Sequence, residues 1–373
     1  MGIRGRFGTT VAAFALGVTG LAVVAPAATA APTAVKSEVS TVRIGPFVLA
    51  PAPLGTVPNQ NQVLPQIATP CSDCFITSVV PDLVYADGSR ADMDTGVMLH
   101  HLVIVEPGKT DVTCGRTEGI GAAGRRIFAA GNERTPITLP DGFGFQLGQE
   151  RWAGIAELMN HSDTAKTVYL TAKVTHVPAN TPGMKPVTPV WLDVNNCSDS
   201  QYSVPAGKSA TPWNWASTIT GRIVAAGGHV HAGGQGLTLD NATTKQRICS
   251  SRATYGMGDM AGMPENNETG MTANSGSSMA TGMDAMAGMV TKMSTCSWDS
   301  LGVLRQGDDL RLTSIYDAPH TLRGVMGIML IAVYETKDLT GGTKAPASMR
   351  RTPDTKVPAE LADDQGGHGH TML

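Results

Sequence analysis

Two pairs of histidines are the residues whose type and spacing most directly suggest chemistry. His229 and His231 stand two positions apart in a glycine-rich run. On a β-strand, residues with this spacing face the same way about 7 Å apart, so two imidazoles can converge on one ion, and the flanking glycines leave space around it. The alternative is two polar residues on a solvated strand face. His100 and His101 stand in the apolar run Val97–Val105, where buried imidazoles need polar partners.

A third group of candidates lies near the end of the strand-like pattern. Tyr316 and Asp317, which we take as candidate catalytic residues, precede the run Val325–Met329. Taken alone, Met326 in this run is typical of a methionine that packs in a core. It becomes a candidate metal ligand when it is considered together with the two histidine pairs.

Taken in this order, the motifs resemble those of the type II copper, ascorbate-dependent monooxygenases, the family of peptidylglycine α-hydroxylating monooxygenase and dopamine β-hydroxylase. The resemblance covers roughly residues 70–335: a His-His pair at a strand end, a His-x-His pair, and a Met-Gly-x-Met strand. The chain is still more similar to the plant stress-up-regulated nodulin-like proteins and their fungal and bacterial relatives. That likeness rests on the stretches Gly228–Gly234, Ile248–Ser251, Met293–Cys296 and His320–Gly327.

The resemblance implies a copper-dependent monooxygenase with one or two copper ions. His229, His231 and Met326 would form the copper site that binds O₂, and His100 and His101 would belong to a second, electron-supplying site. Ascorbate would be the reductant, and a C–H bond of a small molecule that the sequence does not identify would be hydroxylated. The ligand types agree, because imidazole holds copper in both oxidation states whereas a soft thioether favours Cu(I).

Two departures from the family pattern change these expectations. The strand that should supply a third histidine to the electron-supplying site carries Met159 at the matching position. His161, two residues on and on the same strand face, could substitute, and His176 is a further candidate one strand later. Gly227 stands where the peptide-hydroxylating members carry an arginine that grips the substrate's carboxylate, so a peptidylglycine substrate is not expected.

The elements that must position these residues are short strands. Apolar or β-branched runs separated by Gly, Pro, Asp and Asn predict strands over 75–83, 98–105, 155–159, 167–175, 219–225, 236–239, 310–315 and 325–333. No segment has a long apolar period of 3.6 residues. We therefore expect an all-β protein with two tandem antiparallel β-sandwich (jelly-roll-like) domains, residues 70–180 and 181–335. The boundary is a Pro-rich break over 178–189, with the strand pattern restarting at Val190.

The segments outside the two sandwiches have other compositions. Residues 1–30 combine Arg4 and Arg6, an apolar run and Ala28-Thr29-Ala30, which predicts a signal peptide cleaved after Ala30 and a secreted protein. No later apolar run is long enough to span a membrane. Residues 31–69 read as an extended leader or an edge strand, and residues 336–373 as a disordered tail with a His368-Gly-His370 motif.

Export into an oxidising compartment favours disulfides among the six cysteines, with fifteen possible pairings. A redox role for Cys71-Ser-Asp-Cys74 is the alternative for that pair. The family resemblance implies a disulfide between Cys249 and Cys296 that ties together the ends of the segment between them.

That segment, residues 256–293, is a methionine-rich insertion in the second sandwich. Exposed thioethers at this density favour Cu(I), so they form a candidate auxiliary copper-binding loop: Met257, Met260, Met263, Met283, Met286 and Met289. The alternatives are an insertion without function or a non-catalytic extracellular protein that buffers copper with this loop. Nucleic-acid binding is not expected, because 28 Lys and Arg against 31 Asp and Glu leave no basic excess.

Overall fold

Strands make up nearly all the regular structure of this all-β protein. The computed structural model describes residues 37–51, 60–116, 122–256, 289–343 and 345–350, together with Met1, Gly2 and Gly8. Within this part of the chain, every strand pair is antiparallel except β10 with β7. Two short 3-10 turns, η1 (Met93–Thr95) and η3 (Ala347–Arg350), accompany the strands. None of the helical segments described could cross a membrane.

The first half of the described chain builds two sheets. Sheet I has the order β1, β9, β3, β7 and β10, with β6 paired to β3: β1 Glu38–Leu49, β9 Lys166–Pro178, β3 Cys74–Val84, β7 Phe143–Leu147, β10 Lys185–Pro186 and β6 Ile137–Thr138. Sheet II has the order β2 Gln60–Ile67, β8 Trp152–Asn160, β4 Val97–Glu106 and β5 Arg125–Gly131. One apolar core, which includes Leu83, Leu102 and Leu170, draws on both sheets.

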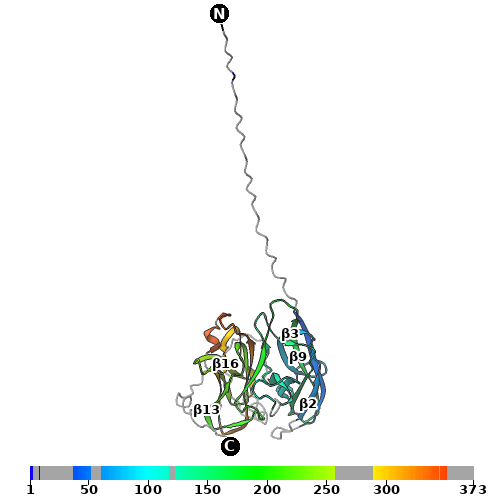
Figure 1. Cartoon of the computed structure of the whole chain (residues 1–373). Helices are drawn as coiled ribbons and strands as arrows, with labels where there is room; N and C mark the ends of the chain where they lie inside the picture. Colours follow the sequence, from blue (N-terminus) through cyan, green and yellow to red (C-terminus); the bar gives the residue numbers. More distant parts are fainter. Residues whose placement is uncertain are drawn as a thin grey trace, which may run out of the picture. The chain divides into compact units, whose positions relative to one another are not determined.

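The second half builds sheet III, sheet IV and a separate pair. Sheet III has the order β11 Thr188–Asp193, β21 Gly327–Glu335, β14 Gly221–Val230 and β18 Thr295–Leu304. Sheet IV has the order β13 Gly207–Ala216, β19 Asp309–Ala318, β15 Gly234–Asn241, β16 Gln246–Tyr255 and β17 Val290–Met293. β12 (Tyr202–Val204) pairs with β20 (Leu322–Val325). A second core, including Leu192, Leu239 and Tyr316, belongs to this half. Figure 1 labels strands of both halves.

A third, smaller apolar cluster joins the two halves. Trp191, Met326 and Ile328 are buried in it, and Val103 of β4 and Ala129 of β5 pack against them. On β4, Leu102 and Ile104 belong to the core of the first half, so the intervening Val103 faces sheet III, as strand alternation requires. Sheet II therefore has one face on its own core and the other toward the second half.

The eight predicted strands all coincide with strands, and the structure refines their ends. The stretch 325–333 is divided at Met326, which lies between β20 and β21. In the stretch read as a leader or an edge strand, β1 and β2 are each the edge strand of a sheet. The disulfide Cys249–Cys296 is confirmed, and Cys71–Cys74 and Cys114–Cys197 complete the pairing of all six cysteines.

Several predicted features lie outside the described residues. They are nearly all of the signal peptide, the tail from residue 351, and the methionines 257, 260, 263, 283 and 286. Met289 is described and half-buried, next to the start of β17. At the predicted domain boundary, the chain between β9 and β11 contains only the two-residue strand β10.

Candidate metal centre

His100 and His101 share one carboxylate because β4 is bulged where they stand. Leu99 pairs with Leu158 of β8, and the next pair is His101 with Glu157. His100 is therefore the extra residue of the bulge. Neighbouring side chains of a regular strand point to opposite faces, but a bulge re-aims one of them. The Nδ1 atoms of both imidazoles lie 2.8 Å from the same oxygen, Oε2 of Glu157.

His229, on β14 of the second half, is held by a carboxylate of the first half. Its Nδ1 lies 3.0 Å from Oε1 of Glu133, which follows β5 and also accepts the peptide N–H of Gly131. A Cβ at Gly131 would stand 2.6 Å from Oε2 of Glu133 and 2.7 Å from Cε1 of His229. Only glycine at this position allows the imidazole and the carboxylate to approach so closely.

His231, just after β14, is fixed by backbone groups and by Tyr316. Its Nδ1 lies 2.9 Å from the carbonyl oxygen of Gly324 in β20, and its peptide N–H donates to the hydroxyl of Tyr316 at 3.0 Å. The same hydroxyl donates to the carbonyl oxygen of Met326 at 2.6 Å. Tyr316 is buried and thus ties the end of β14 to the junction of β20 and β21.

These contacts bring the four imidazoles together. The Nε2 atoms of His101 and His231 lie 2.9 Å apart, and ring nitrogens of His100, His101 and His231 all lie within 4.8 Å of one another. The His229 ring centre is 5.2 Å from those of both His101 and His231, and its buried Nε2 has no hydrogen-bond partner within the described chain. The four histidines that were expected to belong to two copper sites therefore lie around one point.

Hydrogen bonding determines which nitrogen of each ring is available. Each of the four Nδ1 atoms faces an acceptor oxygen: Glu157 for His100 and His101, Glu133 for His229, and Gly324 for His231. A neutral imidazole that donates from Nδ1 carries its lone pair on Nε2. This arrangement, in which carboxylates and a carbonyl orient the imidazoles from behind, is the usual one around metal-binding histidines.

Electrostatics keeps two of the rings neutral. Burial lowers the pKa of His101 to about 4, although its hydrogen bond to Glu157 acts in the opposite direction. Burial and the charges of the neighbouring histidines lower the pKa of His231 well below its ordinary value. The hydrogen bonds from His100 and His101 lower the pKa of Glu157, which stays ionised. Neutral imidazoles and a carboxylate are the forms that metal binding requires.

The buried pair of His229 and Glu133 behaves differently. Burial acts to lower the pKa of His229, but the charge and hydrogen bond of Glu133 outweigh it and raise the pKa. Burial likewise acts to raise the pKa of Glu133, and His229 reverses it, so that the pKa is lowered. A proton on Nε2 of His229 would be a buried donor with no acceptor among the described residues. A proton and a metal ion are therefore alternatives at this atom.

The other candidates for the electron-supplying site, Met159, His161 and His176, have different surroundings. Met159 pairs with Met98 across β8 and β4 and is buried. His161 has both ring nitrogens buried without a hydrogen-bond partner in the described part of the chain, and its pKa is lowered by burial and then by the charge of His100. His176 is bonded elsewhere, since its Nε2 lies 2.8 Å from the hydroxyl of Ser40 on β1.

The three candidates near the end of the strand pattern also have different surroundings. Met326 has its side chain in the cluster with Trp191 and Ile328 that joins the two halves. Asp317 is exposed, on the opposite face of β19 from the buried Tyr316. Because both bonds of the Tyr316 hydroxyl go to backbone groups, its contact with the centre is through the positions of His231 and Met326.

The carboxylates Glu133 and Glu157 were missed by sequence reasoning. Glu157 stands in the otherwise apolar strand Trp152–Asn160, which is the signal that could have found it, because a charged residue in such a strand needs a partner. Glu133 lies in a turn and carries no such signal. Its role depends on Gly131 and on a histidine 96 positions away.

Comparisons with known proteins found one family model and relatives that are named as probable copper-dependent oxygenases. The family described as stress up-regulated Nod 19 matches residues 170–336, which include β14 with His229 and the strands that follow. The "Probable copper-dependent oxygenase M1" of Phoma sp. is 29% identical over 301 residues, which are 74% of this chain and 69% of that protein. The "Probable copper-dependent oxygenase clz3" of Cochliobolus lunatus is 28% identical over 268 residues, 67% of this chain and 76% of that protein.

These likenesses support a relation to the stress up-regulated Nod 19 proteins and to copper oxygenase-like proteins. Among solved structures, the major capsid protein P2 of bacteriophage PM2 aligns over 82% of this chain and 100% of its own, with a TM-score of 0.32 and 11% identity. A TM-score this low supports no inference about the fold.

Proposed function

We propose that this protein is a copper-dependent oxygenase-like enzyme whose copper is held by His100, His101, His229 and His231. The observation that carries the proposal is the set of four buried or half-buried imidazoles with every Nδ1 on an acceptor oxygen. The short distance between Nε2 of His101 and Nε2 of His231 and the unpartnered Nε2 of His229 support it.

The donor set fits copper. Imidazole nitrogens bind copper in both oxidation states, and the carboxylates of Glu133 and Glu157 are engaged with the rings rather than free to form a hard oxygen site. His161, with two unpartnered buried nitrogens, is the candidate for a further ligand. Met326 remains the candidate thioether ligand that the family resemblance implies.

Bound copper would supply the chemistry of oxygen activation, in which one atom of O₂ enters a C–H bond and the other leaves as water, with two electrons from an external reductant such as ascorbate. The chain's own residues orient the ligands, and burial favours the neutral form of His101 and His231. Glu157 fixes two imidazoles at once, and Glu133 fixes a third across the two halves. Tyr316 holds His231 in place through its peptide group.

Copper stoichiometry with electron paramagnetic resonance tests the proposal. We expect wild-type protein to bind copper tightly and the double variants His100→Ala/His101→Ala and His229→Ala/His231→Ala to lose the same signal. His176→Ala is the matched control, because this histidine is bonded to Ser40 on sheet I, and it should keep full binding. If each double variant loses only half of the copper, two separate sites are present, and if neither loses any, the assignment is wrong.

The second candidate function is extracellular copper buffering by the methionine-rich segment. The position of the described C-terminal end of that segment, close to the histidine centre, favours this function. The carbonyl of Val290 accepts the side-chain N–H of Asn132 at 3.3 Å, and the peptide N–H of Met293 donates to Thr135 at 3.3 Å. Asn132 and Thr135 flank Glu133, which orients His229. Deletion of residues 257–288 separates the two functions: an enzyme of the proposed kind keeps the histidine-bound copper, whereas a buffering protein loses most of its capacity.

The finer features of architecture and location are part of the same proposal. Two apolar cores, one in each half, support tandem β-sandwiches of jelly-roll-like form. Three disulfides that use every cysteine support folding in an oxidising compartment, in line with a cleaved signal peptide and a secreted protein. Peptide mass spectrometry of the exported protein would locate the new N-terminus, which we expect at Ala31.

A further inference from the structure

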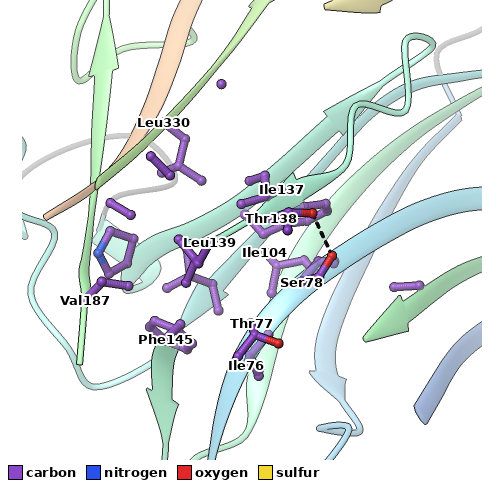
Figure 2. Close-up of a pocket in the computed structure, with 18 of the residues that line it drawn as sticks. Ile76, Thr77, Ser78, Ile104, Ile137, Thr138, Leu139, Phe145, Val187 and Leu330 are labelled. Carbon is purple, nitrogen blue, oxygen red and sulfur yellow. Dashed lines mark hydrogen bonds between the residues drawn. The ribbon is translucent and has the colours of Figure 1, made fainter. Parts of the chain in front are cut away.

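An apolar cavity of about 90 Å³ lies in the first half and reaches sheet III (Figure 2). Its walls come from sheets I and II and from β14, β18 and β21 of sheet III. Ile76, Ile104, Ile137, Leu139 and Leu330 are representative of the lining. The cavity volume is of the same order as the roughly 150 Å³ that accommodates one benzene molecule in an engineered apolar cavity.

The cavity offers nothing to a polar or charged ligand. None of the lining residues carries a charge. Most of its hydroxyl groups are bonded within the protein: Ser78 and Thr138 bond to each other at 3.0 Å, as Figure 2 shows, Thr77 donates to the carbonyl of Thr175 at 3.3 Å, and Thr171 donates to the carbonyl of Asp82 at 3.5 Å. A polar group brought into this space would lose its hydration without gaining a partner, so only an apolar group would bind.

The cavity and the histidine centre lie on one face of one strand. Gly227 on β14 lines the cavity, and His229 follows two positions later. A Cβ built on Gly227 would meet only Thr295 within 4 Å, at 3.5 Å, whereas one built on Gly228 would press against Leu237 of sheet IV. Gly227 and His229 therefore both face away from sheet IV. Their separation along the strand is about 7 Å.

We propose that this cavity binds an apolar hydrocarbon part of the substrate, a short alkyl segment or a single ring, and so selects for substrates oxidised next to such a group. The proposal rests on the proposed function, since it assigns the substrate class of the same centre. On the side of sheet III the cavity is lined by the small residues Ala225, Ala226 and Gly227 of β14. A hydrocarbon seated against them extends along β14 toward His229.

The test uses metal-free full-length protein, so that it does not depend on copper. Toluene is the probe, followed by calorimetry and by NMR shifts of the lining methyl groups, and benzoate is its charged counterpart of similar shape. We expect toluene to bind saturably at one site and benzoate not to bind. Gly227→Val and Ile137→Phe add volume to the cavity lining from β14 and from β6. Because single methylene differences in apolar pockets change binding about 10–200-fold, each should weaken toluene binding at least about tenfold.

Val80→Phe is the matched control, because Val80 is 41% exposed and neighbours the lining residue Val79 on β3. It should bind toluene like wild type. The proposal is overturned if toluene does not bind, if benzoate binds equally well, or if Val80→Phe weakens binding as much as Gly227→Val. Copper binding by the same proteins is measured separately. Copper bound without toluene rejects the cavity alone, and toluene bound without copper rejects the metal centre alone.

Discussion

Within the described residues, an ion-pair cluster and the histidine centre both link the two halves, but they differ in how completely their polar atoms are paired. In the ion-pair cluster, Arg126 of β5 makes two bonds of 2.8 Å to Asp111, and its guanidinium lies 4.9 Å from the ring centre of Trp191 on β11. Thr113 accepts a third bond from Arg126 and donates to the carbonyl of Trp191. In the histidine centre, by contrast, nitrogen lone pairs face one another.

This difference distinguishes a cluster that stabilises the fold from a cluster that can bind a ligand. Charge and hydrogen bonds balance within the pair of Asp111 and Arg126, so that pair needs no ligand. The imidazoles at the centre of the other cluster satisfy their outer nitrogens and leave inner ones, such as Nε2 of His229, without a donor. Burying such atoms is costly unless something binds them. Stability and metal affinity should accordingly respond to different substitutions.

The largest expected effect on stability is at the ion pair. Asp111→Asn leaves the guanidinium of Arg126 buried without its counter-charge, and we expect the free energy of unfolding to fall by about 3–5 kcal/mol. Copper affinity should not change. Urea unfolding of the metal-free protein and a chelator competition titration measure the two quantities.

Asp240→Asn is the control for that substitution. Asp240 pairs with Arg247 at the surface, with both side chains about a quarter exposed, and should cost at most about 1 kcal/mol. Loss of copper affinity in Asp111→Asn would show that the two clusters are coupled and would break the distinction drawn between them.

The opposite response is expected at the carboxylate that orients two imidazoles. Glu157→Gln keeps the shape of the side chain but removes the charge, and substitutions behind metal ligands typically weaken binding about 10–100-fold. We expect that loss of copper affinity in a chelator competition titration. Glu150→Gln, at a partly exposed carboxylate paired with Lys109, should bind copper like wild type. A fully retained affinity in Glu157→Gln would mean that its hydrogen bonds serve folding alone.

Acid should affect the ion-pair cluster in a defined pH window. Burial acts to raise the pKa of Asp111, but the hydrogen bonds and charge of Arg126 outweigh it and lower the pKa from 3.8 to about 2. A lowered folded-state pKa stabilises the protein above the unfolded-state value, here by about 2 kcal/mol, and this contribution disappears as the pH falls from about 4 to about 2. Comparing the pH dependence of unfolding in wild type and Asp111→Asn checks it, since the variant should lack this component.

Much of the fold was predictable because its signals are local. Short apolar or β-branched runs located eight strands, and the histidine pairs that the sequence singled out lie together in the structure. The spacing of His229 and His231 indicated two imidazoles on one face of a strand, an inference that needs only the period of a strand. His229 lies on β14 and His231 directly after it, but the flanking glycines Gly228, Gly233 and Gly234 pack closely against their neighbours and do not leave free space.

The rest depends on contacts between distant residues. The β4 bulge that re-aims His100 has no mark in the sequence, and Glu133 reaches His229 across 96 positions. The family resemblance implied two separate sites for the histidine pairs, and the contact between His101 and His231 that brings the pairs together has no local signal. The boundary between β20 and β21 at Met326 likewise follows from the bond of its carbonyl to Tyr316, not from residue type.

The smallest expected effect on copper binding is at Tyr316. The substitution distinguishes a positioning role of this residue from a catalytic one. Burial raises its pKa, and its hydroxyl is bonded to the backbone of His231 and Met326. Tyr316→Phe removes two hydrogen bonds and should cost about 1 kcal/mol of stability for each. If Tyr316 positions its neighbours, the Tyr316→Phe variant should also have shifted Cu(II) resonance parameters and bind copper only a few-fold more weakly. A variant with an unchanged copper spectrum and no turnover would instead assign Tyr316 a direct part in catalysis, as its place in the sequence suggested.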